Sequence, residues 1–265
     1  MSEREPVRGT PAGSPRALEA VSGAPRAARL VDLGRMRYGP VLELQRRLHA
    51  ARVADELPDT WLLVEHDPVI TLGRNAQEDN LLLPRPLLER HGVEVFEIER
   101  GGDVTYHGPG QLVVYPIRKL ARFREIVPLV RSLEGAVIEA LATFGITGER
   151  WSEHAGVWVH DEQICAVGLA VQKMVSLHGI ALNVSTDLSY PQLINPCGLP
   201  DRGVTSIARE TGRTVSLVEA KRALVPALGK AFHAAFVETP LADIDLDLRP
   251  NSQGESPPPA KNTPL

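Results

Sequence analysis

The sequence predicts an α+β fold in which helices flank a mixed β-sheet. Short apolar runs typical of strands are mixed with segments whose apolar residues recur at helical spacing. Strict alternation of strand and helix is absent in the middle of the chain. Hydrophobic residues make up 43% of the 265 residues, which is enough for a sizeable core. No repeat or linker interrupts residues 29–238, so we expect one domain there.

Both ends of the chain have compositions that disfavour a packed structure. Residues 1–28 alternate proline with Gly, Ser, Ala and Arg, and residues 239–265 close with a run of three prolines before the last few residues. We therefore expect a disordered N-terminal extension over 1–28 and a Pro-rich disordered tail over 239–265.

Three segments carry helix signals. Pro40 followed by apolar residues at three-to-five spacing predicts the first helix. Residues 126–144 carry one apolar face and stop at a glycine, which is typical of a helix C-terminus. Ser216 and Glu219 have the spacing of a capping box, and the helix that they open is expected to reach about Phe236.

Apolar runs bounded by turn residues predict the strands. They lie at residues 61–64, 93–98, 111–117, 156–159, 164–171 and 180–184. Pro116 is expected to end the third of them, because proline cannot donate to a strand ladder.

The charge balance and the cysteine count exclude several classes of protein. The 29 Lys and Arg against 33 Asp and Glu give a net charge of −4, which argues against general nucleic-acid binding. No apolar run is long enough to span a bilayer, and the N-terminus has no apolar signal segment. Two cysteines are too few for a disulfide framework. We therefore expect a cytoplasmic protein that binds neither nucleic acid nor membrane.

A basic cluster stands out on this mildly acidic chain. It consists of Arg118, Lys119, Arg122 and Arg124. Such runs usually form a solvated face, and the other interpretation is a docking surface for an acidic protein partner.

The densest chemical feature is the glycine-rich stretch Arg100–Gln111. Its four glycines are too many for a packed element, but they let a ligand or another backbone approach closely. An arginine precedes the glycines, and a threonine, a tyrosine and a histidine lie between them; these side chains offer donors and a stacking surface. The spacing matches neither the dinucleotide fingerprint nor the P-loop. A hairpin turn with polar decoration is the other interpretation.

The two cysteines have different surroundings. Cys197 lies in a Pro/Gly turn, where a substrate could reach a nucleophilic thiolate, although a small buried cysteine is the simpler interpretation. Cys165 lies among apolar residues of a predicted strand, and we expect it to be buried and inert. Their separation lacks the paired spacing of a zinc site, so no metal is predicted. His178 lies at the start of a predicted strand. It is interpreted either as a base or as a hydrogen-bonded structural residue.

Taken together, these segments resemble the octanoyltransferases of lipoate synthesis. The matching segments, in the family's order, are Glu65–Val69, Thr71–Arg74, Arg100–Gln111, Val114–Ile117, Gly156–Trp158, Ile164–Gly168, His178–Val184, Asn195–Leu199 and Val204–Ile207. The resemblance implies the catalytic domain shared by biotin and lipoate protein ligases, over residues 29–238. It also implies an enzyme that moves an octanoyl or lipoyl group from acyl carrier protein to a lysine of a lipoyl domain, with no cofactor, metal or ATP.

The resemblance also implies the site. Cys197 takes the position of the nucleophile that holds the acyl group as a thioester. The segments implied to bind substrate are Arg100, Gly101, Gly102, Asp103, Val104, Thr105, Tyr106, His107, Ala166, Val167, Gly168, Gly179, Ile180 and Ala181. The implied donor is octanoyl-acyl carrier protein, and the implied acceptors are lipoyl domains of 2-oxoacid dehydrogenases or the glycine cleavage H protein.

One position departs from the family pattern. Where the family has a catalytic lysine, this chain has Gln163. Lys173 does not replace it, because ten residues of extended strand span roughly 30 Å. His107 and His178 are better candidates for a substitute base. The departure supports one alternative, a degenerate acyl- or carrier-binding protein with little turnover. A second alternative is an ATP-dependent lipoate ligase, but such ligases rely on a lysine at position 163 and need no cysteine at position 197, so the sequence fits them less well.

Overall fold

A seven-stranded mixed sheet forms the centre of the protein. We describe a computed structural model, in which residues 23–151, 154–190, 194 and 203–248 are placed. The strands follow the spatial order β10 (Ala234–Glu238), β1 (Arg26–Met36), β2 (Thr60–His66), β6 (Gln111–Ile117), β9 (Val175–Asn183), β8 (Glu162–Gln172) and β7 (Gly156–Val159). β10, β1 and β2 are parallel, and the remaining pairs are antiparallel.

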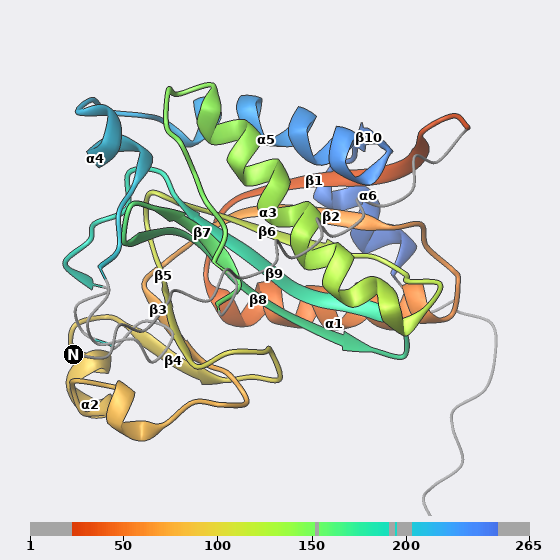
Figure 1. Ribbon diagram of the computed structural model, residues 1–265. Coiled ribbons are helices and arrows are strands. Elements are labelled where there is room, and N and C mark those ends of the chain that lie inside the picture. The colour runs from red at the N-terminus through yellow and green to blue at the C-terminus, as the bar shows by residue number, and fades with distance from the viewer. Residues whose placement is uncertain (1–22, 152–153, 191–193, 195–202, 249–265) are drawn as a thin grey trace, which may run out of the picture.

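Helices cover both faces of this sheet, as Figure 1 shows. Helix α1 (Tyr38–Val53) packs on one face, and α3 (Ile126–Ala142) and α5 (Leu217–Phe232) pack on the other. Trp61 and Leu63 of β2 point toward α3 and α5, whereas Leu62 and Val64 join the core under α1. A strand that is buried on both sides needs apolar residues at successive positions. This burial explains the continuous apolar run that predicted β2.

A smaller sheet lies beside the large one. Its order is β4 (Glu94–Glu97), β3 (Val69–Leu72) and β5 (Val104–His107), and α2 (Arg85–Arg90) packs against it (Figure 1). The glycine-rich stretch, expected to contain no packed element, thus includes strand β5, which pairs with β3. Its turn still needs glycine, because Gly110 has φ +81° and a Cβ there would lie 2.5 Å from the Ser185 carbonyl oxygen.

The end of the last predicted helix is wrong. Helix α5 begins after Ser216 with the expected capping box, but it ends at Phe232, and His233 follows with a left-handed φ of +49°. Residues 234–238 instead form β10, which pairs in parallel with β1. Local helix preference is overridden here by a partner strand from the other end of the chain.

Ordered structure extends past both expected boundaries of the central domain. Strand β1 already begins at Arg26, and helix α6 (Leu241–Asp247) follows β10 within the stretch treated as a Pro-rich tail. Ile244 of α6 is fully buried in the core under α1. Its apolar contact explains why this part of the tail is ordered despite its composition.

The other predicted elements agree with the structure apart from their ends. β9 starts earlier than residue 180, and Pro116 does not end β6, because it faces Trp61 and the strand continues to Ile117. Short elements that the sequence did not signal include β3, α2, η1 (Glu78–Asn80), η2 (Phe123–Glu125) and α4 (Ile207–Thr211). Among the placed residues, no helix has both the length and the apolar character needed to cross a membrane.

Candidate active site

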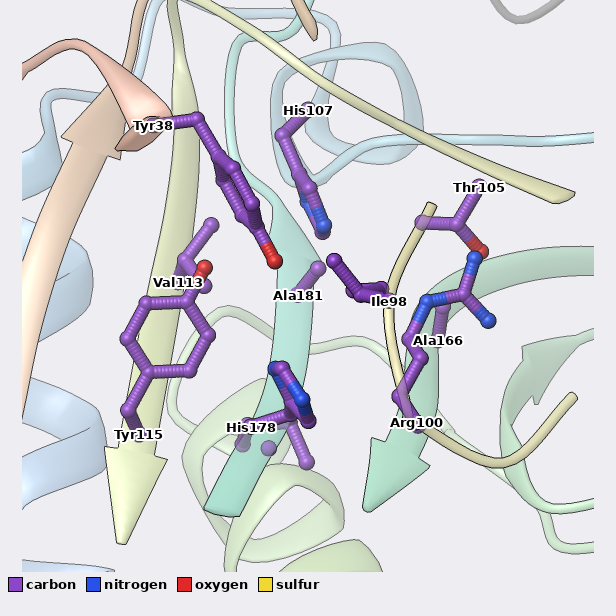
Figure 2. A pocket seen from close by; sticks show the side chains of 13 residues that line it. Tyr38, Ile98, Arg100, Thr105, His107, Val113, Tyr115, Ala166, His178 and Ala181 are labelled. Atoms are coloured by element: carbon purple, nitrogen blue, oxygen red, sulfur yellow. The ribbon is translucent and has the colours of Figure 1, made fainter. Parts of the chain in front are cut away.

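Two adjoining cavities lie where the small sheet meets strands β6, β8 and β9. The first, drawn in Figure 2, is lined by Tyr38, Ile98, Arg100, Thr105, His107, Val113, Tyr115, Ala166, Gly168, His178, Gly179, Ile180 and Ala181. The second is lined by Thr105, Tyr106, Gln111, Gln163, Ala166, Ala181, Asn183, Ile194 and Val204. Thr105, Ala166 and Ala181 line both, so the two cavities lie side by side.

Most of the residues implied to bind substrate line these cavities. The exceptions are Gly101, Gly102, Asp103, Val104 and Val167. Two of these residues make hydrogen bonds that link the glycine-rich stretch to its neighbours. The Gly101 N–H donates to the Leu169 carbonyl at 2.9 Å, and Asp103 accepts from the Asn80 amide at 2.6 Å. Val104 is buried in the core of the small sheet.

Arg100 places a buried guanidinium in the wall of the first cavity. Its Nε donates to Thr71 Oγ1 at 3.0 Å and its Nη2 to the Thr71 carbonyl at 2.6 Å, while Nη1 donates to the Gly101 carbonyl at 2.9 Å. Glycine makes room for it, because a Cβ on Gly168 would lie 3.0 Å from Arg100 Cδ and one on Gly73 would lie 2.8 Å from Nη1.

His107 belongs to a buried hydrogen-bond chain that fixes its tautomer. Gln111 donates its amide to the Tyr106 carbonyl at 3.2 Å and to Asn183 Oδ1 at 2.9 Å, so its own oxygen faces His107 Nδ1 at 2.7 Å. His107 must therefore donate from Nδ1 and keep a lone pair on Nε2. Burial lowers the pKa of His107 to about 3, so the ring is neutral near pH 7.

His66 is fixed in the same way. Its Nδ1 faces the Met36 carbonyl at 3.0 Å and therefore donates, while its Nε2 accepts from the Tyr115 hydroxyl at 2.9 Å. Burial lowers the pKa of His66 to about 4. The Tyr115 ring that it orients lines the first cavity.

His178 enters the first cavity from the middle of β9 with a left-handed backbone, φ +59°. Its N–H donates to Gln45 Oε1 of α1 at 3.1 Å. Burial lowers the pKa of its ring to about 4, although Glu99 opposes that shift. Like His107, it is neutral near pH 7.

Gln163 lies in the wall of the second cavity, beside the segment that follows Cys197. Its backbone N–H donates to the Gly203 carbonyl at 3.0 Å, and its carbonyl accepts from the Thr205 N–H at 3.0 Å. Val204, between those two residues, lines the same cavity. Cys197 and all of Asn195–Leu199 fall outside the described residues.

The other candidates do not reach the cavities. Cys165 is buried, and burial raises the pKa of its thiol far above the ordinary value, as expected for an inert cysteine. Lys173 is exposed in the β8–β9 turn, at the end of β8 opposite Gln163. Within the described part of the chain, no group of three His, Cys, Asp or Glu side chains could hold a metal ion.

The basic cluster lies beyond the Ile117 end of β6, whereas the second cavity lies at the Gln111 end. Arg118 pairs with Asp59 at 3.5 Å, and Lys119 pairs with Asp55. These two residues are therefore part of local ion pairs. Neither lies beside the cavities.

Comparison with known proteins decides the family. Residues 37–229 match the family described as lipoyl protein ligase A/B catalytic domain. An octanoyltransferase from Syntrophobacter fumaroxidans is 47% identical over 221 residues, which cover 83% of this chain and 97% of that protein. One from Caldicellulosiruptor saccharolyticus is 46% identical over 202 residues, which cover 75% and 86%. The chain belongs to the octanoyltransferase family. The predicted family and the predicted acyltransferase class of enzyme are confirmed.

Solved structures confirm the predicted fold class of this octanoyltransferase-family chain. A bipartite lipoate protein ligase from Thermoplasma acidophilum has a TM-score of 0.68 at 18% identity, covering 84% of this chain and 90% of that one. A lipoate-protein ligase A bound with ATP has a TM-score of 0.66 at 16% identity, covering 84% and 92%. At such identities the likeness concerns the fold alone.

The structure adds cavity residues that the sequence did not single out. They include Tyr38, Ile98, Val113, Gln111 and Asn183. Gln111 and Asn183 stand inside segments that carried the resemblance, so their polarity next to glycine and apolar residues was a usable signal. Tyr38 had none, because it lies in the first turn of α1 and reaches the site only through the tertiary fold.

Proposed function

We propose that this chain transfers an octanoyl or lipoyl group from acyl carrier protein to a lysine of a lipoyl domain, through a thioester on Cys197. The observation that carries the proposal is that the two cavities lie side by side and share wall residues. The first cavity has apolar side chains in part of its wall. The second reaches Gln163 and Val204, and Val204 follows Cys197 closely in the sequence. An acyl chain lying in the first cavity would present its carbonyl at the second.

The apolar wall of the first cavity suits an alkyl chain. Ile98, Val113 and Ile180 are among the side chains that form it. At about 0.8 kcal/mol per buried CH₂, the six methylenes of an octanoyl chain would contribute about 5 kcal/mol to binding. Adjacent chain lengths would differ by only about 1–3 kcal/mol, so selection by length should be graded.

The reaction proceeds in two steps in this proposal. The Cys197 thiolate attacks the thioester carbonyl, a new C–S bond forms, and the carrier leaves as a thiol after taking up a proton. The acceptor amine then attacks the acyl-enzyme, an amide forms and the Cys197 sulfur is released. Two protein partners can thus use one site in turn, which gives ping-pong kinetics.

The proton of the attacking amine passes to the departing Cys197 sulfur in our proposal. Neither candidate histidine is well suited to receive it, since the pKa of His107 is about 3 and that of His178 is about 4. A general base is most effective with a pKa near the working pH. Gln163 has no charge, so it can position groups by hydrogen bonding but cannot take a proton.

The donor and acceptors remain those implied by the family. We propose octanoyl-acyl carrier protein as the donor, and lipoyl domains of 2-oxoacid dehydrogenases or the glycine cleavage H protein as acceptors. The reaction requires no ATP because the thioester is already activated. We place it in the cytoplasm, as the first step of lipoate synthesis.

Mass spectrometry of the protein after incubation with octanoyl-acyl carrier protein tests this function. We expect an octanoyl adduct on Cys197, its absence in Cys197→Ser, and amide formation when a lipoyl domain is added. Tight binding without an adduct would support the alternative of a degenerate acyl- or carrier-binding protein, which the presence of Gln163 in place of the family's lysine favours. Modification of a lipoyl domain from octanoate and ATP alone would support the ligase.

A further inference from the structure

Two buried polar side chains on the wall of the first cavity have unused hydrogen-bonding atoms. Tyr38, from the first turn of α1, is 1% exposed, and His178 of β9 is 2% exposed. Within the described part of the chain, neither the Tyr38 hydroxyl nor either ring nitrogen of His178 has a hydrogen-bond partner. Figure 2 shows both side chains pointing into the cavity.

The charged groups around this pair do not satisfy it. Glu99 Oε2 lies 3.8 Å from His178 Nε2, which is too long for a hydrogen bond, and it accepts from Arg46 at 3.3 Å. Arg100 donates to Thr71 and to the Gly101 carbonyl. Because roughly 90% or more of buried polar groups in proteins are paired, these atoms call for a ligand group in the cavity.

The backbone conformation of β9 directs the His178 side chain into the first cavity. Its φ of +59° is unusual for a residue other than glycine within a strand, and the hydrogen bond from its N–H to Gln45 Oε1 holds it there. Backbone strain of this kind persists where the surrounding structure fixes it, and it concentrates at ligand sites.

The pair is suited to a neutral group that both donates and accepts hydrogen bonds. Burial lowers the pKa of His178 to about 4 and raises the pKa of Tyr38, so both side chains are neutral near pH 7. A neutral imidazole carries one donor and one acceptor, and a phenol can do either. A hydroxyl group matches both.

The position of the pair indicates which part of an acyl chain would meet it. Tyr38 and His178 line only the first cavity, whereas Gln163 and Val204 line only the second. With the thioester at the Gln163 side, as the proposed function has it and on which this inference rests, the far end of the chain approaches Tyr38 and His178.

We propose that Tyr38 and His178 form a hydrogen-bonding subsite for a hydroxyl group at the end of a medium-length acyl chain. The cavity then takes acyl chains with a terminal hydroxyl as well as plain alkyl chains. A wholly apolar pocket lacks such partners and would leave the hydroxyl buried and unpaired.

A comparison of two donors tests the subsite: octanoyl-acyl carrier protein and the same donor with a terminal hydroxyl on the acyl chain. In the unmodified enzyme we expect kcat/KM for the hydroxylated chain to lie within about tenfold of that for the plain chain. Tyr38→Phe removes one oxygen, and we expect it to lower the hydroxylated-to-plain ratio about tenfold. The same ratio in both proteins, or rejection of the hydroxylated chain by about 100-fold in the unmodified enzyme, overturns the proposal.

A second variant and a second measurement keep the test decisive if Tyr38→Phe misfolds or if the enzyme shows no transfer. His178→Asn suits the left-handed backbone, since asparagine tolerates it, and should also lower the ratio about fivefold. His49→Asn is the matched control, because His49 lies on α1 and contacts the Gln172 carbonyl outside both cavities, and its ratio should not change. Calorimetry with thioether analogues of both chains measures the subsite without turnover. Absence of transfer therefore contradicts the proposed function, whereas equal changes in affinity for both analogues in Tyr38→Phe contradict the subsite.

Discussion

Arg100 donates two hydrogen bonds to Thr71, one to the hydroxyl at 3.0 Å and one to the carbonyl at 2.6 Å. Thr71 belongs to β3 of the small sheet, and Arg100 lines the first cavity. A single threonine thus fixes a buried cation in the wall against which we expect the acyl chain to lie.

Replacing that hydroxyl by a methyl group should loosen the arginine. We expect Thr71→Val to lower the free energy of unfolding by about 1–3 kcal/mol, because Arg100 Nε would remain buried without that acceptor. Urea unfolding measures the loss. Thr239→Val is the control, since the Thr239 hydroxyl bonds an exposed carbonyl of the same chain segment at 3.0 Å, and an equal loss there would contradict the prediction.

Restoring a cation at position 163 should raise activity near neutral pH. A thiol with a pKa of about 8.5 is only about 3% ionised at pH 7, so a neutral Gln163 could cost up to about 30-fold in rate. We expect Gln163→Lys to raise kcat/KM at pH 7 and to move the pH profile toward lower pH. The measurement is the pH dependence of octanoyl transfer.

Gln172→Lys controls for the added charge, because Gln172 is exposed at the other end of β8. Its pH profile should match that of the unmodified protein. A rate for Gln163→Lys that stays the same or falls would show that another residue already does what the family's lysine does.

Stability should decline when the pH falls below about 6.5. Burial lowers the pKa of His66 to about 4 and that of His107 to about 3, whereas an unfolded histidine has a pKa of about 6.5. Between these values the unfolded state binds more protons than the folded state, so the free energy of unfolding rises with pH.

Each such histidine should contribute roughly 1 kcal/mol per pH unit between pH 6 and pH 5. Urea unfolding across that interval measures the slope, and His66→Gln should reduce it. An unchanged slope in this variant would indicate that His66 already binds a proton in the folded protein.

A side chain at Gly179 should disrupt the wall of the first cavity. Its Cβ would overlap the Val114 carbonyl oxygen of the neighbouring strand β6, and a backbone atom in a central sheet cannot move aside easily. We expect Gly179→Ala to cost roughly 2–4 kcal/mol of stability. Thermal unfolding checks this, with Gly39→Ala as the control, because a Cβ at Gly39 would make only an ordinary contact at 3.5 Å with Phe96.

Sequence reasoning found the elements whose signals are local. The capping box of α5 is present as predicted, with the Glu219 N–H donating to Ser216 Oγ at 3.2 Å. The run that became β2 is apolar because it is buried on both faces. β10 could not be found in this way, because its strand character comes from pairing with β1, which is distant in sequence.

The same distinction applies to the site. The glycines next to Arg100 and the small residues of β8 and β9 are visible in the sequence because close approach demands them. Tyr38 and Tyr115 reach the cavity from α1 and β6. No sequence motif indicates the role of either tyrosine. Only the fold shows that both line the same cavity as His178.

The parallel pairing of β1 with β10 also has a consequence for how the protein is made. Arg26 to Leu30 cannot find their partners until Ala234 to Glu238 have left the ribosome, when nearly the whole ordered region has been synthesised. Until then one backbone edge of β1 is exposed and can associate with other chains. Completion of the sheet should therefore be a late event in folding, slowed by the long loop that must close.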